Sequence, residues 1–381
     1  MKNRIILCLG CLLAFLQLRA QVNTNQQHLC NPNSFSIVLL GDPQNYVKYD
    51  YNQPVFELMT AWTAHHIDSL RVKAVLCTGD LVDQNECILP PFPRFGNLTS
   101  REQWTCYGLD LPYILYVGGF AARKNAALLL RAFGRLDNKV PYLISTGNHD
   151  YGYTRSENSM TRFPEYFPIE RNSQWKKTIV AATNNRNGLP TLENAAMEIT
   201  DEHWGRILII AVEFAPRDEV LSWARELVAA PRFKDHTVIL ITHSYLTGFD
   251  SKRITKEGYK ITPSNTGEGI WQKLVQPSAN IRLVLCGHYA TPNERLDYTT
   301  GFRTDKNAAG HDVHQMMFNC QALGGGMSGN GGDGWLRLLE FLPDGHTVQV
   351  RTYSPLFGFS PQTKDKAWRT ESYDQFQFTI K

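Results

Sequence analysis

The chain has 381 residues, enough for one large domain or two domains of ordinary size. Hydrophobic residues make up 43% and charged residues 20%, a balance typical of globular proteins that excludes a disordered, collagen-like or coiled-coil chain. The formal net charge is +3, but Lys2, Arg4 and Arg19 lie within the first 20 residues, and without them basic and acidic side chains balance. Bulk charge therefore gives no reason to expect a nucleic-acid partner.

The first 20 residues have the pattern of an export signal. Apolar residues 5–18 follow Lys2 and Arg4, and the segment ends at a small residue, Ala20. The apolar stretch is too short for a typical transmembrane helix. We therefore predict a signal peptide over residues 1–20, no stable membrane span after its removal, and a secreted or periplasmic protein. The polar residues 21–34 are expected to form a flexible lead.

Six of the eight cysteines follow the predicted signal peptide, where export would permit disulfides. Cys77 and Cys286 lie in apolar, strand-like runs, a position typical of buried thiols. Cys87 and Cys106 lie in a loop-rich stretch. A disulfide between them and two separate thiols both remain open.

From residue 35 onward, short apolar runs alternate with segments of helical spacing. The runs are rich in β-branched residues, and the expected strands are residues 36–40, 73–78, 140–146, 206–214, 236–242 and 280–286. The expected helices between them are residues 54–70, 126–136, 217–229 and 267–274. This alternation predicts an α/β fold. The pattern of the C-terminal residues predicts a β-rich final part of the same domain, 35–381. The expected strands there are residues 313–319, 335–342, 347–354 and 374–380.

The carboxyl ends of five expected strands carry acidic, amide or imidazole side chains. The motifs are Gly-Asp-Pro-Gln from Gly41, Gly-Asp-Leu-Val-Asp from Gly79, Gly-Asn-His-Asp from Gly147, Thr-His-Ser from Thr242 and Gly-His-Tyr from Gly287. Each residue alone is explained by a helix cap, a turn or a buried histidine. Because α/β sheets bind ligands where strand ends feed loops, the joint pattern predicts a metal site. Its mixed oxygen and nitrogen donors suit Mn, Fe or Zn better than Ca or Mg.

In this order the five motifs resemble the calcineurin-like metallophosphoesterase superfamily, over roughly residues 36–290. The resemblance implies two packed mixed β-sheets flanked by helices, with metals at the strand ends. It also implies a phosphatase or phosphodiesterase, in which two adjacent divalent metals activate a hydroxide that attacks the phosphorus of a phosphate ester. The sequence does not identify the substrate class, which could be a phosphomonoester, a phosphodiester, a nucleotide or a phosphoprotein.

The resemblance also assigns roles to individual residues. Asp80 matches the ligand that bridges the two metals, and Asp42 matches a ligand of one of them. The remaining ligands of the other metal correspond to Asn148, His243 and His288. His149 matches the histidine that faces the substrate phosphate and the leaving group, and Asp150 is the candidate to orient its imidazole.

Two positions depart from the family pattern. The first motif usually ends in histidine where this chain has Gln44, and the last usually ends in histidine where it has Ala290. Both changes fall on the same metal, so we expect one tightly bound metal and a second that is weak or absent. His311 and His314 are candidates to replace the missing ligand. The alternative hypothesis is a catalytically weakened or inactive binding protein.

Other segments carry weaker signals. Residues 112–136 form an atypical, insert-like segment that resembles a short piece of GT-B glycosyltransferases, which raises a sugar-nucleotide transferase as a third hypothesis. The glycine-rich residues 324–334 are expected to form a flexible loop that could border the active site. Asp83 is either a solvated loop acid or a metal ligand. Arg217 either contacts the substrate phosphate or forms a structural ion pair.

Overall fold

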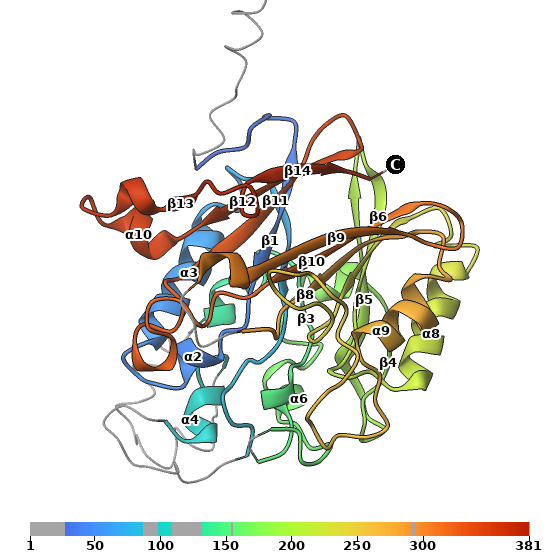
Figure 1. Cartoon of the computed structure of the whole chain (residues 1–381), viewed down its shortest axis with the longest axis horizontal. Coiled ribbons are helices and arrows are strands. Elements are labelled where there is room, and N and C mark those ends of the chain that lie inside the picture. Colours follow the sequence, from blue (N-terminus) through green and yellow to red (C-terminus); the bar gives the residue numbers. More distant parts are fainter. Residues whose placement is uncertain (1–26, 87–97, 109–131, 154, 291–294, 381) are drawn as a thin grey trace, which may run out of the picture.

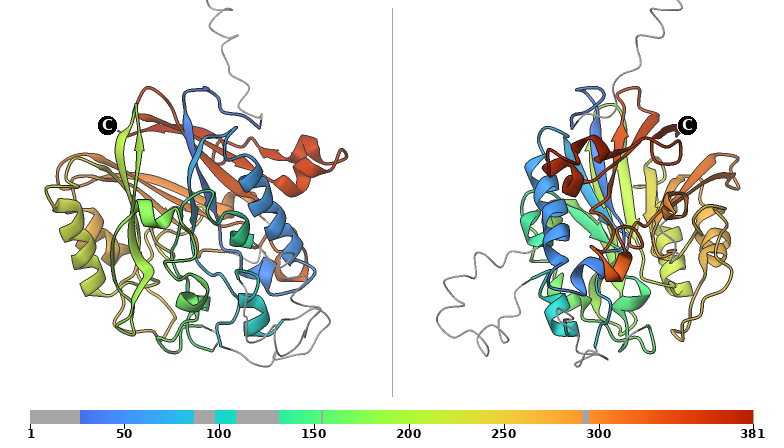
Figure 2. Two further views of the ribbon diagram at one scale, coloured as in Figure 1. Left: turned by 180° about the vertical axis from the view of Figure 1, so that it is seen from behind. Right: turned by 60° about the vertical axis from the view of Figure 1, so that its left-hand side comes forward.

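Two seven-stranded mixed sheets pack face to face, with helices on their outer faces (Figure 1). The computed structural model describes residues 27–86, 98–108, 132–153, 155–290 and 295–380. Figure 2 shows the same layers from behind and from one side. This is the predicted α/β architecture of two mixed sheets flanked by helices, with a β-rich C-terminal section.

The first sheet is built around β1 (Phe35–Leu40), which is buried along its whole length. It lies parallel to β2 (Val72–Cys77) and antiparallel to β11 (Leu336–Phe341). The strand order is β13-β12-β11-β1-β2-β3, and β14 also pairs with β12. The remaining strands are β3 (Tyr142–Ile144), β12 (Thr347–Tyr353), β13 (Trp368–Arg369) and β14 (Phe376–Thr379). The C-terminal strands therefore extend the sheet that the first strand begins.

The second sheet has the order β4-β5-β6-β7-β8-β10-β9. Its strands are β4 (Ile179–Asn184), β5 (Pro190–Asp201), β6 (Gly205–Ala211), β7 (Thr237–Ile241), β8 (Ile281–Cys286), β9 (Thr300–Lys306) and β10 (Asp312–Phe318). Side chains alternate along β6, as strand geometry requires. Ile207 and Ile209 enter the core that the two sheets share, whereas Leu208 and Ile210 belong to the core on the opposite face.

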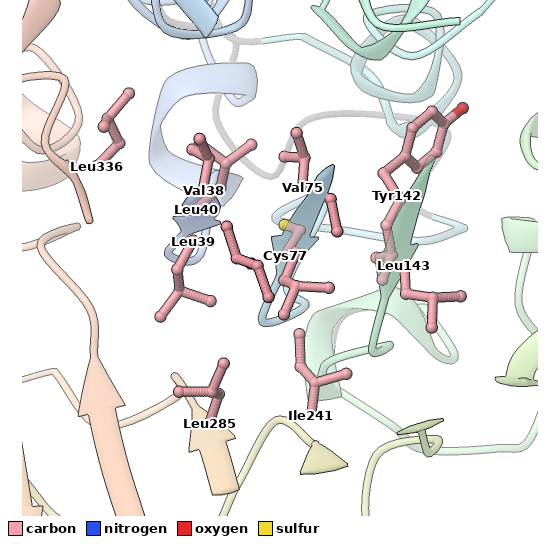
Figure 3. Close-up of a cluster of buried hydrophobic side chains, with 14 of the residues drawn as sticks. Val38, Leu39, Leu40, Val75, Cys77, Tyr142, Leu143, Ile241, Leu285 and Leu336 are labelled. Carbon is pink, nitrogen blue, oxygen red and sulfur yellow. The ribbon is translucent and has the colours of Figure 1, made fainter. Parts of the chain in front are cut away.

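Helices close the two outer faces. The first sheet is covered by α3 (Gln53–His65), and the second by α8 (Asp218–Ala229) and α9 (Gly267–Ile270) (Figures 1 and 2). The shorter helices are α2 (Gln44–Val47), α4 (Ser100–Trp104), α6 (Phe163–Tyr166), α7 (Trp175–Thr178) and α10 (Pro355–Phe359). Figure 3 shows Leu39 of the first sheet facing Leu285 and Ile241 of the second.

The predicted strands are present within a few residues of their expected bounds, but β4, β5, β9 and the two-residue β13 were not predicted. The sequence of β5 mixes buried Glu193 and Asn194 with alanines, so it lacks the apolar run that marks a strand. β5 forms because β6 supplies antiparallel partners from Ala195 to Asp201. The predicted helix 267–274 is α9, which continues into a π-helical turn, Trp271–Val275.

The described part of the expected flexible lead, residues 27–34, packs against the first sheet. Leu29 is buried, and the Asn31 amide donates a hydrogen bond to the Glu340 carboxylate at 3.1 Å. These contacts do not fit a free lead over residues 27–34.

Several predictions fall on residues outside the described ranges. These include the signal peptide, the pairing of Cys87 with Cys106, and most of the insert-like segment 112–136, of which the short helix η2 (Ala132–Arg135) is described. In the described ranges, no helix has the length and apolar character that crossing a membrane requires.

Candidate metal centre

The loops after β2, β3, β7 and β8 bring four side chains together at one end of the two sheets. Asp80 and Asn148 come from the first sheet, and His243 and His288 come from the second. All four are buried or nearly so. The cluster therefore spans the interface between the sheets.

The donor atoms of these side chains lie at ligand-to-ligand distances. The Asn148 Oδ1 atom is 3.1 Å from His243 Nε2 and 2.8 Å from His288 Nδ1. The two histidine nitrogens are 3.1 Å apart, and His243 Nε2 is 3.4 Å from Asp80 Oδ2. One nitrogen or oxygen atom from each side chain thus faces a common point.

This arrangement fits a divalent cation. Donors about 2.1 Å from a tetrahedral ion are about 3.4 Å from one another, and closer when more ligands share the ion. Two imidazoles, a carboxylate and an amide oxygen form a donor set that suits Mn, Fe or Zn. The residues present therefore fit the predicted metal, and Asp80, Asn148, His243 and His288 are the residues that would hold it.

Glycine allows the loops to approach this closely. A Cβ atom on Gly287 would lie 2.1 Å from Asp42 Oδ1, and one on Gly147 would lie 2.2 Å from Asp80 Oδ1. Asp80 and His288 themselves have left-handed backbone, with φ of 50° and 68°. Such backbone is rare for residues other than glycine, and it concentrates at functional sites.

The electrostatics of the cluster favour a cation. Burial raises the pKa of Asp42 to about 7, although nearby His243 acts against this. Burial would lower the pKa of His243, but the Asp80 and Asp42 carboxylates raise it to about 10. Burial and the neighbouring His243 lower the pKa of His288 to about 3, which leaves it neutral and able to coordinate. A cation would supply the positive charge that the buried carboxylates attract.

The position predicted for a second metal is built differently. Thr78 donates a hydrogen bond to Asp42 Oδ1 at 2.6 Å, and Asn319 Nδ2 donates to Asp42 Oδ2 at 2.6 Å. Gln44 Nε2 donates to Gln321 Oε1 at 2.5 Å, which leaves Gln44 Oε1 buried without a hydrogen-bond partner. This position offers one free amide oxygen and a carboxylate already surrounded by donors.

His149 and Asp150 are close to the cluster, but Asp150 does not orient the imidazole. The His149 Nδ1 atom is 2.7 Å from the Asp83 carbonyl oxygen. Asp150 instead accepts hydrogen bonds from the amides of Leu81 and Gly147, which ties the β2 and β3 loops together. The expected role of Asp150 is thus corrected, because its carboxylate is fully used by backbone amides.

Asp80, Asn148 and His288 of the cluster line a pocket of about 460 Å³. The lining includes predicted residues together with others that the sequence motifs did not indicate, and the latter include Asn45, Arg155, Tyr259 and Gln321. No local motif marks these residues, because they lie in segments far apart in the sequence. Gly325 and Gly326 also line the pocket, so the glycine-rich loop does border the site.

The remaining candidates have structural roles. His311 Nδ1 contacts the Ala279 carbonyl, and His314 contacts Thr304 and the Thr379 carbonyl, so neither replaces the ligand missing at Ala290. Arg217 pairs with Glu213 at 2.8 Å, which matches the ion-pair alternative. Asp83 pairs with Lys48 at 2.8 Å on the pocket wall.

Comparisons with solved structures give low similarity. GAP50, the anchor in the inner membrane complex of Plasmodium, is 12% identical, with 91% of this chain and 89% of that chain covered and a TM-score of 0.42. A dimetal phosphatase from Danio rerio is 12% identical, with 92% and 99% covered and a TM-score of 0.44.

Comparisons of sequence give a firmer result. The uncharacterized protein YvnB of Bacillus subtilis is 26% identical over 355 residues, which are 91% of this chain. The chain spans only 22% of the length of that relative. The family model of calcineurin-like phosphoesterases matches residues 35–292, the region that holds all five strand-end motifs. This chain therefore belongs to the calcineurin-like phosphoesterase family.

Proposed function

We propose that this protein is a secreted or periplasmic, metal-dependent hydrolase of a phosphate ester, acting as a phosphatase or a phosphodiesterase. The observation that carries the proposal is the meeting of four metal-donor atoms in a pocket whose lining also holds His149. Family membership supports the same reaction class. The export part of the proposal rests on the pattern of residues 1–20.

The chain's own residues divide the chemistry between them. A divalent metal, when bound by Asp80, Asn148, His243 and His288, would act as a Lewis acid and lower the pKa of water. His149 is held through Nδ1 by the Asp83 carbonyl, which accepts and so requires an N–H at Nδ1. Its Nε2 atom is then free to donate a proton, in the imidazolium form, to the oxygen of the leaving group.

The proposal includes an asymmetric metal centre with one tight and one weak or absent metal. The tight position has two imidazoles, while the other depends on Asp42 and Gln44 and has no side-chain ligand from Ala290. Neutral amide oxygens bind Mn, Fe or Zn less strongly than imidazole does.

The pocket lining favours an anionic ester. Arg155 lines the pocket together with His149, and the fork of an arginine guanidinium matches phosphate oxygens. This lining does not select among phosphomonoesters, phosphodiesters, nucleotides and phosphoproteins.

The direct test is metal-dependent hydrolysis by residues 21–381. An aryl phosphate monoester and a diester would be offered with Mn²⁺, Zn²⁺ or a chelator, and Asp80→Asn would serve as the inactive control. Turnover that requires metal and is lost in Asp80→Asn supports the proposal. Turnover that survives both the chelator and Asp80→Asn contradicts it.

A binding protein with the same fold and one metal is the second candidate. Ala290 and the amide contacts around Asp42 favour it, because they weaken the second metal position. Tight binding of Mn²⁺ together with no turnover of either ester would favour this candidate. The transferase hypothesis depends on residues 112–136 alone, and absence of binding to nucleoside diphosphate sugars would remove it.

A further inference from the structure

The loop after β7 includes an irregular segment, residues 255–261, which we name the strap and which places Tyr259 in the pocket lining. Its side chains alternate, as in a strand. Lys256, Gly258 and Lys260 are exposed, whereas Glu257 and Tyr259 are half-buried and face the molecule. The strap therefore presents one carboxylate and one aromatic ring to the metal centre.

Both of these inward side chains contact the same metal ligand, His288. The Glu257 Oε2 atom is 3.7 Å from His288 Nε2, and the two side chains are only 13% and 16% exposed. The Tyr259 ring lies 5.8 Å from the His288 ring, at an interplanar angle of 72°. The Ser244 hydroxyl donates a hydrogen bond to the other oxygen of Glu257, which fixes the carboxylate.

The two imidazoles of the centre have different outer partners. His243 directs Nε2 at the donor cluster and holds Nδ1 2.7 Å from the Thr78 carbonyl. His288 directs Nδ1 at the cluster, so its Nε2 atom faces Glu257. Metal-bound histidines commonly direct their second nitrogen at a carbonyl or a carboxylate, which fixes the ring and raises its basicity.

We propose that Glu257 is a positioning residue for His288 and that the strap thereby sets the affinity of the tight metal position. The inference rests on the cation site of the proposed function. Glu257 holds the His288 ring with Nδ1 toward Asn148 and His243, and its negative charge strengthens the imidazole as a donor. Ser244 directly follows His243 in the loop after β7. This loop therefore carries one candidate ligand, His243, and also the hydroxyl that holds Glu257 beside the other, His288.

The test measures metal affinity directly, by competition of Mn²⁺ and Zn²⁺ with a fluorescent chelator. Loss of an outer carboxylate typically weakens metal binding about 10- to 100-fold, and we expect this for Glu257→Gln. Lys256→Gln, an exposed neighbour on the same strap, should bind as the parent does. Asp83→Asn removes a pocket carboxylate that pairs with Lys48, and should weaken binding less than Glu257→Gln.

A second measurement separates positioning from folding. The visible spectrum of the Co²⁺-loaded protein should change in Glu257→Gln, because the ligand field of His288 changes, while the melting temperature of the metal-free protein stays constant. Parent-like affinity in Glu257→Gln, or an equal loss in Asp83→Asn, would overturn the inference. Both measurements report metal binding, so the inference can be tested even if the parent protein hydrolyses no ester. Absence of hydrolysis would contradict the proposed function and not this inference.

Discussion

Single side chains divide the candidate centre into a cluster of potential metal donors and a histidine, His149, that we propose faces the substrate. The metal donors are buried, whereas His149 is held at the pocket by the Asp83 carbonyl. In the proposed function, His149 would therefore serve the leaving group without joining the cluster. This division predicts that binding and turnover can be separated by substitution.

His149→Ala should keep the metal affinity of the parent and lose turnover by about 10²- to 10⁴-fold, the usual contribution of general acid catalysis. The measurement pairs a chelator competition with hydrolysis of an aryl phosphate. His288→Ala is the contrasting variant and should lose both. Equal loss of metal from His149→Ala would show that this histidine is a ligand.

Ala290→His should add affinity for a second metal, because it returns an imidazole to the pocket that Gln44 also lines. Metal content per chain at rising Mn²⁺ would be measured by elemental analysis, with the parent alongside. We expect the variant to approach two ions at concentrations where the parent holds one. An unchanged metal content would mean that the Asn319 and Gln321 amides, not Ala290, close this position.

At the scale of elements, the loops depend on backbone that only small residues permit. A methyl group at Gly287 would lie 2.1 Å from Asp42 Oδ1 and 2.4 Å from Thr78 Oγ1. Gly287→Ala should therefore cost about 1–3 kcal/mol of stability and weaken metal binding. Gly258→Ala is the control, because nothing lies within 4 Å of its added methyl group. Urea unfolding and metal titration would test both, and a parent-like Gly287→Ala would contradict this account.

Strand β5 carries a buried carboxylate that links the sheet to the site. Glu193 accepts hydrogen bonds from Tyr151 at 2.9 Å and from Asn185 at 2.8 Å. Burial raises its pKa from 4.5 to about 6. Because the folded pKa is the higher one, the stability that the neutral form contributes is present below pH 4.5 and is lost as pH rises through 6.

Glu193→Gln should remove this dependence on pH. Relative to the variant, the parent should lose about 2 kcal/mol of unfolding free energy in total as the pH rises from well below 4.5 to well above 6. Urea unfolding of both proteins across this range gives the difference, which cancels other titrating groups. A constant difference would show that Glu193 ionises in the folded protein as it does in the unfolded chain.

At the scale of the whole molecule, the candidate metal centre lies where the two sheets meet. Asp80 and Asn148 follow strands of the first sheet, and His243 and His288 follow strands of the second. A bound cation is therefore expected to hold the sheets together at this end.

Saturating metal should raise the melting temperature. A ligand at 100 times its dissociation constant adds about 2.7 kcal/mol to the stability of the folded state. Thermal unfolding with Mn²⁺ and with a chelator would measure this, and Asp80→Asn should remove the shift. If Mn²⁺ did not change the melting temperature of the parent protein, the proposal that a bound cation links the two sheets would be wrong.

Apolar runs and strand-end motifs were enough to predict the central strands, the α/β fold and the residues Asp80, Asn148, His243 and His288. They succeed because a buried strand and the polar turn after it are contiguous in the chain. The polar strand β5 and the edge strand β9 escaped prediction, because partner strands rather than their own residues impose their extended form.

Sequence alone therefore determined the fold class and the candidate ligands that follow buried strands, since local pattern carries both. Only the tertiary structure decided the partners of these ligands. It assigned Asp150 to backbone amides, His149 to the Asp83 carbonyl and Glu257 to His288. Each of these contacts joins loops that packing of the sheets brings together, and no spacing along the chain encodes that packing.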